Sequence, residues 1–112
     1  MKLVIEREHW ERGTSSARLR KDNGQMCCLG FFGLACGIEP DTLLGAGSPE
    51  EIADRAWPDW ALLDSEGAYH LMDSETIELL IEANDGKEAT EPEREARIAE
   101  LFAEHGVEVE FV

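Results

Sequence analysis

Basic side chains gather at the start of the sequence, in a pattern typical of anion binding. Six of the ten lysines and arginines lie within residues 1–21, beside three of the twenty-five acids. Guanidinium groups hold phosphate and carboxylate oxygens through paired hydrogen bonds, and a tryptophan ring offers a face for stacking. We therefore predict a ligand-binding site for a small anion, made by Trp10, Arg12, Arg18, Arg20 and Lys21.

A structural role for the same arginines is the alternative. Residues 16–20 alternate between apolar and polar side chains, which predicts a strand with Arg18 and Arg20 on one face. In a sheet with the C-terminal strand, these arginines would pair across the strands with Glu108 and Glu110.

Asn84 is a further candidate, because it lies on the apolar stripe of a predicted helix. A buried amide needs hydrogen-bond partners. One interpretation is a helix end at which Asn84 and Asp85 bond nearby backbone before Gly86. The other is an amide that lines a pocket and binds the edge of a ligand, so Asn84 joins the predicted ligand-binding residues.

The sequence carries no pattern typical of catalysis or of metal binding. It lacks a phosphate-binding Walker loop, a nucleophile elbow and an HExxH motif, and most carboxylates fall on outer helix faces. Cys27, Cys28 and Cys36 include no Cys-x-x-Cys pair, and the three histidines are scattered. We predict a protein that is not an enzyme, holds no metal or cofactor, and keeps three reduced, buried thiols.

Length and charge limit the class of protein. A chain of 112 residues predicts a single domain over 1–112. A net charge of −15 disfavours direct binding to nucleic acid or to an anionic membrane. The longest apolar run, residues 26–38, is too short to span a bilayer, and the charged N-terminus is unlike a signal peptide. We therefore expect a cytoplasmic protein.

Hydrophobic periodicity predicts the elements of the first part of the chain. Residues 2–7 and 16–20 are typical of strands, and 107–112 alternates as a final strand. Residues 25–36 are apolar on every face, which favours a helix buried all round over a buried strand. Its glycines would allow another backbone to approach closely, and Gly37 would end it in a Schellman motif.

The later elements are helices with recognisable caps. Ser48 and Glu51 form a predicted capping box, a break follows at 57–60, and segments 60–63 and 68–72 are compatible with a hairpin. Two amphipathic helices follow, one from a cap at Asp73 to Gly86 and one from the Thr90–Glu93 capping box to Gly106. The predicted fold is α+β, a small antiparallel sheet of two N-terminal strands plus the C-terminal strand, with a buried central helix and two C-terminal amphipathic helices.

Several motifs together resemble a group of small accessory proteins of tailed phages and prophages. The resemblance rests on Trp10-x-Arg12-Gly13, Met26-Cys27-Cys28-Leu29-Gly30-Phe31, Ala35-Cys36-Gly37, Asn84-Asp85 and the closing VEVEF. Its most specific parts are the Cys-Cys-Leu-Gly core and the later Asn-Asp pair. The resemblance implies a viral protein acting in the cytosol of an infected bacterium, and it assigns no catalytic or binding residue.

Two binding functions are compatible with these features. The favoured hypothesis is a host-defence antagonist that sequesters a small anionic, nucleotide-type signal molecule. The alternative is an acidic inhibitor that mimics DNA on a host protein, since residues 22–112 hold twenty-two acids and four bases. An enzyme acting on nucleotides would need carboxylates that point inward, and the pattern shows few. Open edges of a small sheet would also permit a homo-oligomer.

Overall fold

The described parts of the chain combine helices with one small sheet, so the predicted α+β class is confirmed. They are residues 1–52, 56–62 and 75–112 of a computed structural model. In chain order the elements are β1 (Lys2–Ile5), the 3-10 turn η1 (Arg7–His9), α1 (Cys28–Ala35), α2 (Pro40–Leu43), the 3-10 turn η2 (Pro49–Glu51), α3 (Asp59–Leu62), α4 (Glu75–Asp85), α5 (Glu91–Ala103) and β2 (Glu108–Phe111). Within these ranges no helix is both long and apolar enough to cross a membrane.

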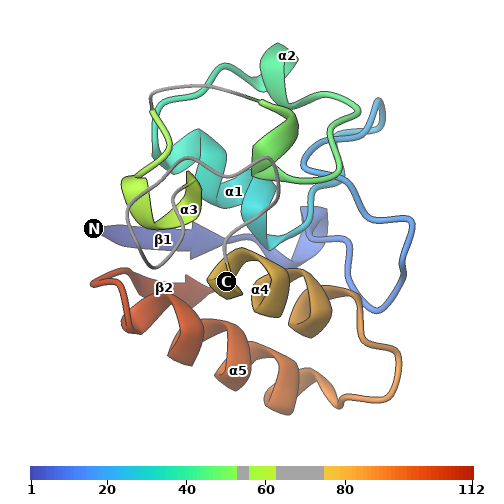
Figure 1. Ribbon diagram of the computed structural model, residues 1–112. Coiled ribbons are helices and arrows are strands. Elements are labelled where there is room, and N and C mark those ends of the chain that lie inside the picture. Colours follow the sequence, from blue (N-terminus) through green and yellow to red (C-terminus); the bar gives the residue numbers. More distant parts are fainter. Residues whose placement is uncertain (53–55, 63–74) are drawn as a thin grey trace.

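The sheet consists of β1 and β2, which lie side by side and point the same way (Figure 1). Leu3 lies opposite Val109, and Ile5 lies opposite Phe111. The side chains of Leu3 and Ile5 are buried, and those of Val109 and Phe111 are partly buried against the same core. The alternation predicted from the sequence for residues 107–112 is thus present, with Val109 and Phe111 on the inward side.

The predicted antiparallel sheet is wrong, because strand direction depends on how the chain returns to the sheet. α5 lies along β2 and packs against it (Figure 1). After the helix, Gly106 has a φ of 77°, and the amide of Val107 donates to the carbonyl of Phe102 at 3.1 Å. This turn sends the chain back along α5 and parallel to β1. The apolar alternation of β2 carries no information on direction.

Residues 16–20 do not form a strand of this sheet, so this second prediction is also wrong. Their two apolar side chains are buried, as the alternation implied. The backbone bonds to two loops instead. The amide of Leu19 donates to the carbonyl of Ala46 at 2.8 Å, and the carbonyl of Arg18 accepts from the amide of Cys27 at 2.8 Å. Alternation over five residues shows only that the side chains on one side are buried. Packing against loops buries those side chains as well as packing within a sheet does.

The predicted cross-strand pairing of Arg18 and Arg20 with Glu108 and Glu110 is therefore wrong too. Both glutamates lie on β2, whose neighbour is β1. There the ammonium group of Lys2 lies 2.9 Å from the carboxylate of Glu110. The two arginines are thus left outside the sheet.

α1 is the helix predicted from the apolar run, but it begins at Cys28, and burial on every face is wrong for its last turn, where Ala35 is exposed. It ends in the predicted Schellman motif, in which Gly37 has a φ of 96° and the amide of Ile38 donates to the carbonyl of Gly33 at 3.0 Å. Close packing explains a second glycine, because a Cβ on Gly30 would lie 1.8 Å from the carbonyl oxygen of Leu19. The bare backbone of α1 therefore lets the loop that carries the arginines lie directly against it.

α4 and α5 confirm the two predicted amphipathic helices. At the start of α5 the side chain of Thr90 accepts from the amide of Glu93 at 3.3 Å, and the Glu93 carboxylate accepts from the amide of Thr90 at 3.2 Å. α4 packs against both α1 and α5. The centre of the core contains large side chains with less than 2% exposure, among them Phe32, Leu80, Ile98, Leu101 and Phe102.

The predicted capping box in the middle of the chain is also confirmed. The carboxylate of Glu51 accepts from the amide of Ser48 at 2.9 Å, and Pro49 follows the cap as the first residue of η2. Trp57 is buried, and its indole N–H donates to the carbonyl of Ile52 at 3.1 Å. This tryptophan covers the core.

The hairpin predicted for residues 60–63 and 68–72 is wrong in its first strand. Trp60 belongs to the short helix α3, which begins after Pro58. A proline fixes φ near the helical value, so it favours a helical turn at this point. Residues 68–72 and the predicted cap at Asp73 lie outside the described part of the chain.

Candidate functional site

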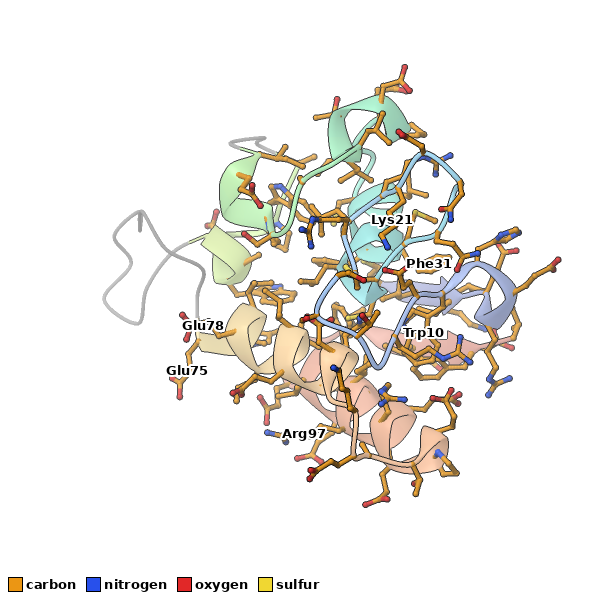
Figure 2. All side chains as sticks on the ribbon, turned by 90° about the vertical axis from the view of Figure 1, so that its right-hand side faces the viewer. Trp10, Lys21, Phe31, Glu75, Glu78 and Arg97 are labelled. Atoms are coloured by element: carbon orange, nitrogen blue, oxygen red, sulfur yellow. The ribbon has the colours of Figure 1, made fainter. Side chains whose placement is uncertain are left out.

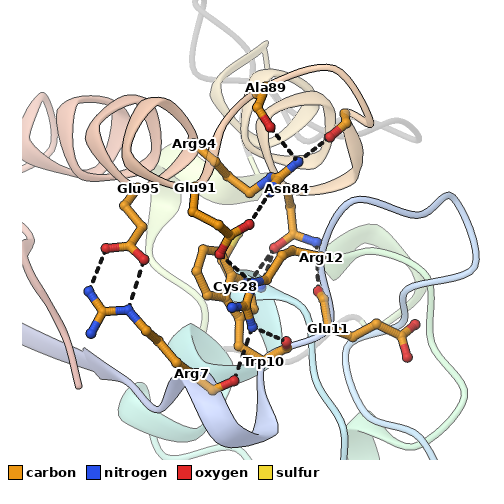
Figure 3. A network of polar contacts seen from close by, with 11 residues as sticks. Arg7, Trp10, Glu11, Arg12, Cys28, Asn84, Ala89, Glu91, Arg94 and Glu95 are labelled. Atoms are coloured by element: carbon orange, nitrogen blue, oxygen red, sulfur yellow. Dashed lines mark hydrogen bonds and ion pairs between the residues drawn. The ribbon is translucent and has the colours of Figure 1, made fainter.

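The structure divides the predicted site residues between two places. One group forms a polar network that joins the N-terminal segment to α1, α4 and α5 (Figure 3), and it contains Trp10, Arg12 and Asn84. The other group lines an open pocket, and it contains Arg18, Arg20 and Lys21. The predicted residues therefore do not form a single site.

The Asn84 side chain is the centre of the network (Figure 3). Its Oδ1 accepts from the indole N–H of Trp10 at 2.7 Å and from the amide of Cys28 at 3.0 Å. Its Nδ2 donates to the carbonyl of Glu11 at 3.0 Å and to the carboxylate of Asp85 at 3.1 Å. All four hydrogen-bonding positions of this buried amide are thus occupied by the protein itself.

Trp10, predicted as a stacking face for a ligand, is covered by neighbouring side chains. Its exposed fraction is 2%. The ring centroid lies 5.1 Å from that of Phe111, and the guanidinium carbon of Arg12 lies 4.5 Å from the ring centroid. Both contacts stabilise the indole in place by aromatic and cation–π attraction.

Arg12 and its neighbour Arg7 are bound to acids of α5. The Nε of Arg12 donates to Glu91 at 2.8 Å, and the same carboxylate accepts from the buried Arg94. Arg7 donates two hydrogen bonds to Glu95, at 2.9 and 2.7 Å. These hydrogen bonds lower the pKa of Glu95. The bases that precede the pocket residues are therefore neutralised within the fold.

The open pocket, which we call the basic pocket, has a volume of about 360 Å³. It is lined by Arg18, Arg20, Lys21, Asp22, Asn23, Leu44 and Gly45. Three of the predicted ligand-binding residues thus meet in one cavity, although they do not meet Trp10, Arg12 or Asn84.

The two arginines of the basic pocket differ from most other bases of the chain. Arg18 donates to the carbonyl of Ala17 at 3.0 Å, and Arg20 contacts the sulfur of Met26 at 3.7 Å. Among the described residues, neither guanidinium forms an ion pair with a carboxylate. Lys21, by contrast, lies 2.6 Å from a carboxylate oxygen of Glu11.

A tight turn shapes one wall of the basic pocket. The amide of Gly24, which has a φ of 85°, donates to the carbonyl of Lys21 at 2.9 Å. The side-chain oxygen of Asn23 accepts from the amide of Gln25 at 3.0 Å. Asp-Asn-Gly favours such turns, because asparagine bonds nearby backbone and glycine adopts positive φ.

Leu44 and Gly45, which also line the basic pocket, belong to a segment without a sequence motif. The amide of Gly45 donates to the carbonyl of Arg20 at 2.9 Å, which fixes this segment beside the arginines. Leu44 keeps 46% of its surface exposed there. Leu44 and Gly45 were absent from the predicted site, and no feature of the sequence places them next to the bases.

The three cysteines carry free thiols, and the prediction that all three are buried is wrong for Cys36. Cys27 and Cys28 are buried, whereas Cys36 is half-buried in a second, mainly apolar pocket that also contains Trp60 and His105. Burial raises the pKa of Cys36 to about 11 and the pKa of Cys28 well above its ordinary value. The described residues include no group of three or more side chains suited to holding a metal ion.

A thiol titration of the native protein should therefore label at most Cys36, and slowly. Its raised pKa keeps the reactive thiolate scarce near neutral pH, so the rate should rise steadily with pH towards about 11. All three thiols should react fast in denaturant. Rapid native labelling of Cys27 or Cys28, identified by peptide mass spectrometry, would contradict their burial in the core.

Comparison of the chain with protein-family models, curated proteins and solved structures finds no match. The assignment of a function therefore depends on the residues of the basic pocket and on the chemistry that their charges permit.

Proposed function

We propose that the protein sequesters a small anionic, nucleotide-type molecule in the basic pocket. The observation that carries this proposal is that Arg18 and Arg20 line one cavity while neither pairs with an acid of the described chain. Guanidinium groups without a direct ion pair raise the local positive potential, although Arg18 also acts electrostatically on the carboxylate of Asp85. A phosphate group would lower the energy of this arrangement through bidentate hydrogen bonds.

The charge of the rest of the chain makes these arginines unusual. The sequence holds twenty-five acids and ten bases, so a base readily finds an acidic partner. Bases paired in this way outside the pocket are Lys2, Arg7, Arg12, Arg94 and Arg97.

Small-molecule sites commonly enclose roughly 300–1,000 Å³, and the basic pocket falls near the lower end of this range. The surrounding acids would repel a large polyanion more than a small one.

Sequestration requires binding alone, which agrees with a sequence that lacks catalytic motifs. The resemblance to phage accessory proteins supports a role inside an infected bacterium. There, capture of a nucleotide signal would prevent its recognition by a host-defence protein.

Substitution of the two arginines tests this proposal. We expect the protein to bind AMP or GMP in isothermal titration calorimetry, and Arg18→Gln and Arg20→Gln each to weaken binding by roughly tenfold or more. The reason is the loss of a charge-assisted hydrogen bond to phosphate. Because neither arginine forms an ion pair with an acid in the described chain, the melting temperature of each variant should stay close to that of the wild type.

Lys87→Gln is the matched control. Lys87 is an exposed base without an acidic partner among the described residues, and it lies outside the basic pocket. Lys87→Gln removes one positive charge, as Arg18→Gln and Arg20→Gln do, and it should leave nucleotide binding intact. The proposal is overturned if no nucleotide binds, or if the control weakens binding as much as the pocket variants do.

The acidic face of α4 favours a second function, that of an inhibitor of a nucleic-acid-binding protein. Glu75, Glu78 and Glu82 are exposed and form no ion pair within the described ranges. Figure 2 shows Glu75 and Glu78 well separated from Lys21 of the basic pocket. This function predicts that the protein displaces duplex DNA from a host DNA-binding protein. Glu78→Gln should weaken that displacement, and Arg18→Gln should leave it unchanged.

A further inference from the structure

We infer that the basic pocket selects a nucleoside monophosphate over both inorganic phosphate and a nucleoside triphosphate. The inference rests on the proposed function, because it specifies the ligand of the same pocket. It follows from the three lining residues that are not basic and that offer distinct contacts, namely Asp22, Asn23 and Leu44.

Asp22 limits how much negative charge the pocket accepts. Its exposed carboxylate lines the same cavity as Arg18 and Arg20, and within the described ranges it forms no ion pair. Lys21 is already paired with Glu11. The lining charges without a direct ion pair are therefore two guanidinium groups and one carboxylate, a net charge of +1, and Arg18 also acts electrostatically on the carboxylate of Asp85. A monophosphate group, with a charge of about −1.5 to −2 near pH 7, already exceeds that net charge, and the additional phosphates of a triphosphate would meet the Asp22 carboxylate at a loss of electrostatic energy.

The carboxylate also favours a ligand that brings a hydrogen-bond donor. An ionised aspartate accepts hydrogen bonds and donates none. The hydroxyl groups of a ribose, or an exocyclic amine of a base, supply such a donor next to the phosphate. Asn23 complements them: its Oδ1 is used by the amide of Gln25, so its NH₂ group is the part that can donate to a ligand oxygen.

Leu44 provides the apolar contact that inorganic phosphate cannot use. It is one of the few large apolar side chains that remain exposed in the described chain, with 46% of its surface accessible. The hydrogen bond between Gly45 and the carbonyl of Arg20 holds this segment against the arginines. A ligand with a sugar or a base attached to its phosphate would cover Leu44 and remove apolar surface from water.

Titration calorimetry at fixed ionic strength with phosphate, adenosine, AMP and ATP tests this selectivity. We expect AMP to bind at least about tenfold more tightly than each of the other three. Asp22→Asn should then lower the Kd for ATP, so that the ratio of the Kd for ATP to the Kd for AMP falls by about tenfold. Leu44→Ser should weaken AMP binding and leave phosphate binding unchanged, because it removes an apolar contact and no charge.

The outcomes separate the failure of this inference from that of the proposed function. If none of these anions binds the wild-type protein, both fail. If phosphate, AMP and ATP bind with similar affinity, and Arg18→Gln and Arg20→Gln weaken all three, the proposed function stands and the selectivity is overturned. The selectivity is likewise overturned if ATP binds more tightly than AMP and Asp22→Asn leaves the ratio of their two Kd values unchanged.

Discussion

Substitution of Gly30 by alanine should destabilise the protein by more than about 3 kcal/mol, because overpacking against a fixed backbone is among the most damaging changes in a core. The added Cβ would lie 1.8 Å from the carbonyl oxygen of Leu19 and 2.9 Å from the Cβ of Met26. The loop cannot retreat without breaking its hydrogen bonds to Cys27 and Ala46, both 2.8 Å long. Urea denaturation followed by circular dichroism measures the loss.

Ala35→Gly in the same helix is the control for this prediction. Ala35 is exposed and is the last residue of α1, so its replacement changes helix propensity and little else, with an expected loss of at most about 1 kcal/mol. If Gly30→Ala were no more destabilising than this control, the close approach of the loop to α1 would be wrong. The attachment of the pocket arginines to α1 would then need revision.

Asn84→Asp should produce a loss of stability that grows with pH. The substitution keeps an oxygen for Trp10 and Cys28 but replaces the donors to Glu11 and Asp85 by a second oxygen. Burial already raises the pKa of the adjacent Asp85. A carboxyl introduced beside it should have a folded-state pKa above its unfolded value, so the folded state binds more protons and stability falls as the pH rises.

The expected loss is about 3 kcal/mol near pH 7 and much smaller near pH 4, where a protonated carboxyl can still donate one hydrogen bond. Differential scanning calorimetry over this pH range, with the wild type measured in parallel, gives the comparison. Asn23→Asp is the control, because Asn23 is exposed and uses only its side-chain oxygen. A loss at Asn84 that does not vary with pH would contradict the role of its amide as a double donor.

Features that depend on close neighbours in the chain were predicted from the sequence. The capping box of Thr90 and Glu93 and the Schellman end at Gly37 each involve residues within one helical turn or so. Their hydrogen bonds form wherever those residues occur in that order. The apolar stripe of α4 is equally local, because it reports the period of the helix itself.

The sheet could not be predicted in the same way, since it depends on contacts between distant segments. Alternation identified the inward side of residues 16–20, but it could not tell a sheet from the loops around Cys27 and Ala46. Strand direction in β2 follows from the packing of α5, which a pattern of apolar residues does not encode. Long-range packing decided both features.

The candidate site shows the same division. The concentration of bases led to Arg18, Arg20 and Lys21, which the structure brings to one pocket. The same composition argument also selected Arg12, which α5 neutralises through Glu91. A base paired within the fold and a base available to a ligand look identical in a sequence. The distinction requires knowing where each acid lies in space.

The parallel pairing of β1 with β2 has a consequence for the order of folding. Leu3 and Val109 are partners across nearly the whole length of the chain. The entropy lost on closing a loop rises with its length, and proteins rich in such distant contacts fold slowly. The helical hairpin of α4 and α5 with β2 involves near neighbours and can form early, whereas β1 can join only after the intervening chain has condensed. We therefore expect the sheet to form late in folding, after the local contacts of α4, α5 and β2.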